Sequence, residues 1–175
     1  LAHNGSLGIF PEGGSHDRTD LLPLKAGVAI MALGCMDKHP DVSVKIVPCG
    51  MNYFHPHKFR SRAVVEFGEP IEISKELVHK YHNPETNKDA VKELLDTITK
   101  GLKSVTVTCQ DYETLMVVHA MRRLYSSQFS GSLPLPMIME MNRRIVNGYQ
   151  LHKDDPQMKE LTAVSYTHLT LPTKA

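Results

Sequence analysis

The chain changes character at Asn83-Pro84, and this change limits the folds that it can adopt. Before that point, short apolar runs alternate with a helical stretch, a pattern typical of a sheet with helices packed against it. After it, apolar residues recur every three or four positions, which indicates amphipathic helices. We therefore expect an α/β fold with a mixed, largely parallel sheet and flanking helices, followed by a helical extension.

The expected elements of the first half follow from these patterns. Strands are predicted at residues 6–10, 42–47, 62–67 and 71–73, and a helix is predicted at residues 25–35. Pro48 and Gly50 indicate where the second of these strands leaves the sheet. Ser74 is expected to cap a short helix that contains Leu77 and Val78.

In the second half, the periodicity predicts helices at residues 88–105, 111–125 and 137–149. We predict a domain boundary after residue 82, so that residues 1–82 hold the sheet and residues 83–163 form the helical extension. Residues 164–175 break the helical pattern before them and resemble sequencing read-through. They are excluded from the fold prediction as a non-native tail.

Composition and charge exclude several classes of protein. The 20 Lys and Arg residues nearly balance the 19 Asp and Glu residues, for a formal net charge of +1. A nucleic-acid partner is therefore not expected, because such proteins normally carry a basic field. No apolar run approaches the roughly 20 residues that span a bilayer. The cysteines, Cys35, Cys49 and Cys109, are far apart and odd in number, which favours a compartment facing the reducing cytosol.

The clearest chemical signal is the segment Phe-Pro-Glu-Gly-Gly-Ser-His-Asp-Arg, which begins at residue 10. Its paired glycines, Gly13 and Gly14, let backbone N–H groups approach an anion, and the helix predicted after them adds positive potential. Arg18 and Lys25 supply cations for a phosphate. The carboxylate of Glu12 would repel a phosphate unless it accepts substrate hydroxyls or orients an arginine. These residues suggest a phosphorylated polyol as the ligand, and a tight strand-to-helix turn without a ligand explains them equally well.

Four segments, in this order, resemble conserved blocks of the glycerolipid acyltransferases. They are Phe10-Pro11-Glu12-Gly13 with Gly14-Ser15, Leu22-Pro23-Leu24-Lys25-Ala26-Gly27, Ile46-Val47-Pro48-Cys49-Gly50, and Val65-Glu66-Phe67-Gly68-Glu69-Pro70-Ile71. The longer string from Phe10 to Lys25 is most similar to the fungal glycerol-3-phosphate/dihydroxyacetone-phosphate acyltransferases. The resemblance identifies residues 1–82 as the C-terminal part of an acyltransferase domain.

The resemblance implies transfer of a fatty acyl group from acyl-CoA to the 1-hydroxyl of glycerol 3-phosphate, with dihydroxyacetone phosphate as a second possible acceptor. This is the first step of phospholipid and triacylglycerol synthesis, and it would take place on the cytosolic face of the endoplasmic reticulum membrane. Acyl-CoA would be a co-substrate, no metal or other cofactor is implied, and membrane attachment would come from segments absent from this chain. The substrate-binding residues implied are Glu12, Gly13, Gly14, Ser15, Arg18 and Lys25.

Two departures from the family pattern bear on the site. An arginine often stands at the position of Ser15, so Arg18 or His16 is expected to take its place. The catalytic base of the family is a His-x4-Asp pair N-terminal to the Glu-Gly loop. No histidine here has an aspartate five positions later, and His16 and Asp20 are one residue too close. The pair is expected upstream of Leu1, so this chain is predicted to have no turnover by itself.

The sequence also allows other interpretations of the function. The main alternative is a non-catalytic phosphoglycerol- or lipid-binding module that kept the loop without the base. A thioesterase-like hydrolase is disfavoured because no Gly-x-Ser-x-Gly elbow is present. His55 and His57 flank a proline without a nearby acid or cysteine, which indicates a surface loop and not a metal site. The aromatic and basic residues 53–62 are expected in a solvated connection, with a membrane surface or the CoA phosphates as the alternative contact.

Overall fold

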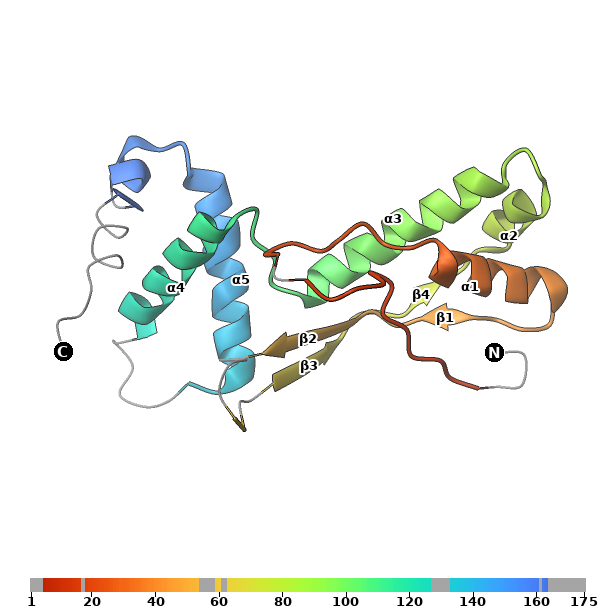
Figure 1. The fold of residues 1–175 in the computed structure, drawn as a ribbon, viewed down its shortest axis with the longest axis horizontal. Helices are drawn as coiled ribbons and strands as arrows, with labels where there is room; N and C mark the ends of the chain where they lie inside the picture. The colour runs from red at the N-terminus through yellow and green to blue at the C-terminus, as the bar shows by residue number, and fades with distance from the viewer. Residues whose placement is uncertain are drawn as a thin grey trace. The chain divides into compact units, whose positions relative to one another are not determined.

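The computed structural model of the chain describes residues 5–16, 18–53, 59–60, 63–126, 133–160 and 162–163 (Figure 1). It divides into two compact units. The first comprises Leu1–Asp17 and Leu21–Thr106, and the second comprises Arg18–Asp20 and Val107–Ala175. Each unit has its own hydrophobic cluster. Helices and strands are both present, which confirms a mixed helix and strand class.

The first unit holds most of the secondary structure. Its elements are α1 (Gly27–Lys38), β1 (Lys45–Ile46), β2 (Cys49–Tyr53), β3 (Ala63–Phe67), β4 (Ile71–Glu72), α2 (Lys75–His82) and α3 (Asn87–Val105). The helices predicted at 25–35 and 88–105 are therefore confirmed, with shifts of a few residues at their ends. The boundary predicted after residue 82 stays a prediction, although α3 packs against α1 and α2 within this unit.

The helices α1, α2 and α3 pack against one another (Figure 1), and their buried side chains supply most of the hydrophobic core of this unit. Leu33 on α1 and Leu94 on α3 are almost completely buried. The apolar stripe of α3 faces this core, as its periodicity predicted. The other buried members of the core are Ala29, Ala32, Val44, Ile73, Leu77, Ala90 and Ile98.

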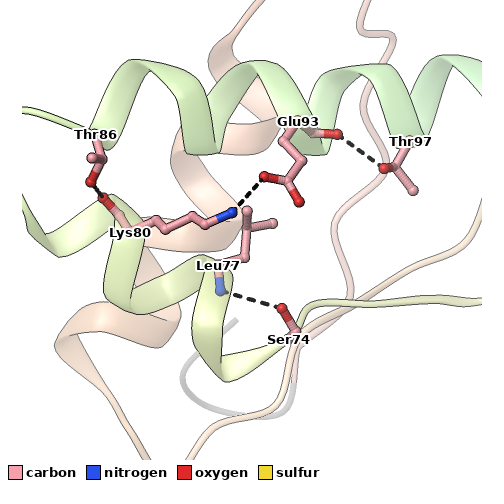
Figure 2. A network of polar contacts seen from close by, with 6 residues as sticks. All are labelled: Ser74, Leu77, Lys80, Thr86, Glu93 and Thr97. Carbon is pink, nitrogen blue, oxygen red and sulfur yellow. Dashed lines mark hydrogen bonds and ion pairs between the residues drawn. The ribbon is translucent and has the colours of Figure 1, made fainter.

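The expected cap of α2 is confirmed. Ser74 precedes the helix in an extended conformation, and its hydroxyl accepts a hydrogen bond of 3.3 Å from the backbone N–H of Leu77 (Figure 2). Such a cap satisfies one of the N–H groups that the first turn of a helix leaves without a partner. Figure 2 also shows Lys80 of α2 paired with Glu93 of α3 at 3.1 Å, on the exposed side of the helix pair.

The sheet differs from the expected one. β1 pairs with β4 and β2 pairs with β3, and both pairs are antiparallel and form separate two-stranded sheets. The segment between Tyr53 and Ala63 is shorter than the dozen or more residues that a parallel crossover requires. The largely parallel sheet is therefore not found among the described residues.

Two strand predictions were wrong. Residues 6–10 form no strand, and the side chains of Leu7, Ile9 and Phe10 are exposed instead of buried. An extended apolar run becomes a strand only where a neighbouring strand supplies hydrogen bonds, and no described strand pairs with this run. The second error concerns Pro48 and Gly50, which were expected to end a strand. The chain instead forms β2 from Cys49 onward, and the strand predicted at 42–47 is limited to β1.

The position of Gly50 explains why a glycine lies inside β2. A Cβ atom on this residue would lie 2.1 Å from the backbone oxygen of Val105, at the C-terminal end of α3. The side-chain amide of Asn52 donates a hydrogen bond of 3.2 Å to the same oxygen. The hairpin can therefore approach the end of α3 only because residue 50 has no side chain.

The described residues of the second unit include the helices predicted at 111–125 and 137–149. These helices are α4 (Tyr112–Ser126) and α5 (Leu135–His152), which pack against each other. The carboxylate of Asp111 accepts a hydrogen bond of 2.6 Å from the backbone N–H of Thr114 and so caps α4. Cys109 lies buried in the cluster of this unit, and burial raises the pKa of its thiol. In the part of the chain that the structure describes, no helix is both long and apolar enough to cross a membrane.

Some predictions concern residues outside the described ranges. They are the surface position of His55 and His57, most of the aromatic and basic stretch 53–62, and the non-native tail at residues 164–175. These stay predictions.

Candidate functional site

The segment singled out in the sequence forms a tight turn next to the start of α1. The backbone N–H of Gly13 donates to the carbonyl oxygen of Phe10 at 3.3 Å, which closes the turn. The carbonyl oxygen of Pro11 accepts a hydrogen bond of 2.7 Å from the backbone N–H of Lys25, two residues before the helix. The turn is therefore fixed to the segment that leads into α1.

Gly13 and Lys25 are in direct contact. Gly13 has a φ of +70°, a conformation that side chains with a Cβ rarely adopt. A Cβ atom there would also lie 3.1 Å from Cγ and 3.2 Å from Cε of Lys25, so the methylene chain of the lysine covers this glycine. The two predicted site residues are thus brought together. The positive φ favours glycine here, and a larger side chain would also have to push the lysine chain aside by a few tenths of an ångström.

The carboxylate of Glu12 is held by two donors. Its Oε2 accepts a hydrogen bond of 2.6 Å from Nε2 of His16 and one of 3.0 Å from the backbone N–H of Leu22. Both bonds end on the same oxygen, and Oε1 receives no hydrogen bond from the described residues. The side chains of Glu12 and His16 are 26% and 21% exposed, so the carboxylate is partly shielded but still reachable from solvent.

This environment favours the ionised form of Glu12. Burial raises the pKa of its carboxyl, but the hydrogen bonds from His16 and Leu22 and the charge of His16 lower it. The net effect is a pKa below the ordinary value. An ionised carboxylate only accepts hydrogen bonds, so its second oxygen is suited to a donor such as an alcohol hydroxyl.

The remaining predicted residues are placed differently. Gly14 and Ser15 are exposed, and nothing in the described part of the chain lies within 4 Å of a Cβ built on Gly14. Arg18 is exposed and belongs to the second unit, and Asp17 lies outside the described residues. The structure therefore groups Glu12, Gly13 and Lys25, and the assignment of these residues to a substrate stays a prediction.

Sequence reasoning missed the contact between Glu12 and His16. The search for a catalytic pair considered only a histidine followed by an aspartate, whereas this histidine follows its partner carboxylate by four residues. The Glu-x3-His spacing was the available signal. The described residues contain no group of three or more His, Cys, Asp or Glu side chains arranged to hold a metal ion.

Comparison with known proteins relates the chain to one class of enzymes. The family model of the glycerol-3-phosphate acyltransferase 2 C-terminal domain matches residues 117–167. The chain is 80% identical over 162 residues to glycerol-3-phosphate O-acyltransferase 1 of Saccharomyces cerevisiae. The aligned region covers 93% of this chain and 21% of that relative. The chain is 51% identical over 168 residues to glycerol-3-phosphate O-acyltransferase 2 of the same yeast, covering 96% of this chain and 22% of the relative.

A third relative is an uncharacterized acyltransferase of Schizosaccharomyces pombe, 50% identical over 164 residues, or 92% of this chain and 24% of the relative. No solved structure matches the chain. These matches confirm the similarity to the fungal glycerol-3-phosphate acyltransferases that the four sequence blocks indicated. The chain spans less than a quarter of the length of these curated relatives.

Proposed function

We propose that this chain is a segment of a glycerol-3-phosphate O-acyltransferase, which moves a fatty acyl group from acyl-CoA to the 1-hydroxyl of glycerol 3-phosphate. The observation that carries the proposal is the Glu12 carboxylate. It is ionised, about three-quarters shielded and held through one oxygen, and the neighbouring Gly13 is covered by the side chain of Lys25. The yeast relatives with which the chain shares most of its length carry the matching name.

The proposed substrate contacts follow from the charges around the turn. Oε1 of Glu12 accepts a hydroxyl of the glycerol backbone, and the ammonium of Lys25 binds the phosphate. The start of α1 supports the second contact, because no side chain caps it and its first turn holds no acidic residue. The space beside Gly14 leaves room for the ligand. Dihydroxyacetone phosphate has the same phosphate and would be an alternative acceptor.

The catalytic base would come from a His-x4-Asp pair in another part of the full-length protein, as the family resemblance implies. The same resemblance implies acyl-CoA as the co-substrate without a further cofactor, and attachment to the endoplasmic reticulum membrane outside this segment. In the enzyme, a histidine next to the acceptor hydroxyl would remove its proton as the oxygen attacks the thioester carbon. The C–S bond would then break, and the CoA sulfur would leave as the thiol after it takes that proton from the histidine. Glu12 and Lys25 would hold the acceptor for that attack.

We also propose that the hairpin β2–β3 forms part of a larger, mostly parallel sheet in the full-length protein. Residues that alternate along the two strands share one face, and this face is exposed although all its side chains are apolar. An isolated two-stranded sheet is marginally stable, so a covering layer is expected. The residues of this face are Cys49, Met51, Tyr53, Ala63, Val65 and Phe67.

The test is acyl-CoA-dependent acylation of glycerol 3-phosphate by the full-length protein that carries this segment. We expect Glu12→Ala to lower kcat/KM at least about tenfold, since a substrate hydroxyl loses its charged acceptor. Glu85→Ala, which changes an exposed glutamate outside the turn, serves as the matched control and should leave the rate unchanged. An inactive wild type, or equal rates for wild type and Glu12→Ala, would contradict the proposal and favour a binding module.

A further inference from the structure

The contact between His16 and Glu12 assigns a role to a residue that the family pattern leaves undecided. His16 is one of two candidates for the phosphate-binding position that an arginine fills in many relatives of this family. We propose that His16 instead positions Glu12, so that it controls recognition of the glycerol hydroxyls and not of the phosphate. This inference rests on the proposed function and names the residue that prepares its acceptor site.

The geometry supports a positioning role. The hydrogen bond of 2.6 Å between Nε2 of His16 and Oε2 of Glu12 is short, as expected for a bond to an ionised acceptor. The side chains of His16 and Glu12 are only 21% and 26% exposed, so water competes less for the bond than it would at the open surface. The second donor to the same oxygen is the backbone of Leu22, ten residues along the chain from Glu12. Among the described residues, His16 is the side-chain donor to this oxygen, so its removal would leave the carboxylate held by a single backbone N–H.

The same geometry argues against a phosphate-binding role. An ionised carboxylate has no proton to share, so Nε2 of His16 must carry the hydrogen and direct it to Glu12. That nitrogen is then not available to a phosphate oxygen. A phosphate close to His16 would also approach the negative charge of Glu12, which costs energy. Lys25, which contacts Gly13 on the turn, is the better phosphate partner.

The two roles predict different responses to two ligands. Glycerol 3-phosphate has hydroxyls and a phosphate, whereas inorganic phosphate has only the anion. If His16 positions Glu12, loss of His16 weakens binding of glycerol 3-phosphate and leaves binding of inorganic phosphate unchanged. If His16 binds the phosphate, both ligands are weakened together.

The experiment uses His16→Leu and His16→Gln in the full-length acyltransferase that carries this segment. Leucine removes the donor, while glutamine keeps an N–H group at a similar reach. For His16→Leu we expect KM for glycerol 3-phosphate to rise about tenfold, with a smaller change in kcat. The inhibition constant for inorganic phosphate should stay within about twofold of wild type. His16→Gln should recover most of the loss, and Lys25→Gln should raise the inhibition constant for phosphate.

A double-mutant cycle with Glu12→Gln separates positioning from a general structural effect. We expect His16→Leu combined with Glu12→Gln to be no worse than Glu12→Gln alone, because a positioning residue affects the substrate through the carboxylate. Additive losses, or a raised inhibition constant for phosphate in His16→Leu, would overturn the assignment. An active wild type with an unaffected His16→Leu variant overturns it too. A wild type without activity overturns the proposed function itself, and the inference with it.

Discussion

The helical core of the first unit and the turn around Glu12 belong to the same unit but are held together in different ways. The core buries aliphatic side chains of α1, α2 and α3, and Leu33 and Leu94 have almost no exposed surface. The turn exposes Phe10 and is fixed by a few hydrogen bonds, of which two end on the carboxylate of Glu12. The free energy of folding therefore comes mainly from the core, while the turn fixes a polar group that we propose binds the acceptor.

The largest effect on stability is expected from truncation of the core. Leu94→Ala removes a side chain that is 2% exposed, and the surrounding helices can only partly fill the cavity. We expect the free energy of unfolding to fall by about 3 kcal/mol. Urea denaturation of the chain, followed by circular dichroism, measures the change. Lys92→Ala on the exposed side of α3 is the control and should stay within about 0.5 kcal/mol.

A smaller loss is expected where the hairpin meets α3. Gly50→Ala places a methyl group 2.1 Å from the backbone oxygen of Val105, so the strand has to shift. We expect destabilisation of about 2 kcal/mol, within the usual range for overpacking. Gly34→Ala in α1 is the matched control, because the new methyl would lie at an ordinary 3.6 Å from the Tyr81 hydroxyl. That change should stabilise the helix by about 0.5–1 kcal/mol, and equal effects at both glycines would contradict the close approach.

The smallest effect on stability is expected in the turn, and it depends on pH. The pKa of Glu12 is lowered by folding, so the ionised carboxylate contributes stability above its ordinary value of 4.5 and loses it as the pH falls through the folded value. Glu12→Gln should lower the free energy of unfolding by less than about 0.5 kcal/mol at pH 7, because the carboxylate is a quarter exposed. The difference from wild type should shrink on acidification below pH 4.5. A difference that is constant from neutral to acidic pH would show that the ionised carboxylate is not held as described.

The same contrast explains which features could be predicted from the sequence. The helices α1 to α5 follow from local periodicity and from capping residues such as Ser74, which act over a few positions. The strand pairing of the sheets does not follow from local periodicity, because it depends on which strand lies alongside in the folded chain. Residues 6–10 have the composition of a strand without a described partner strand, and β2 contains Gly50 for a reason that lies 55 residues away, at Val105.

The candidate site was predicted in part. The glycine-rich turn, Glu12 and Lys25 were identified from their residue types, and the structure places Lys25 against Gly13. The partners of the carboxylate were not foreseen. One is a histidine four residues after the carboxylate, a spacing that differs from the His-x4-Asp pattern of the family. The other is the backbone N–H of Leu22, a group that every residue except proline offers. A sequence pattern contains no signal for such a backbone contact.

The most direct test of the account is kcat/KM for glycerol 3-phosphate in wild type and Glu12→Gln, measured in the full-length protein alongside the unfolding midpoint of the same preparations. Glutamine keeps the size of the side chain but removes the charge that holds His16 and the proposed substrate hydroxyl. The account predicts a loss of at least about tenfold in kcat/KM with nearly the same unfolding midpoint. Equal kcat/KM values, or a loss that matches a collapse in stability, would show that Glu12 only supports the turn.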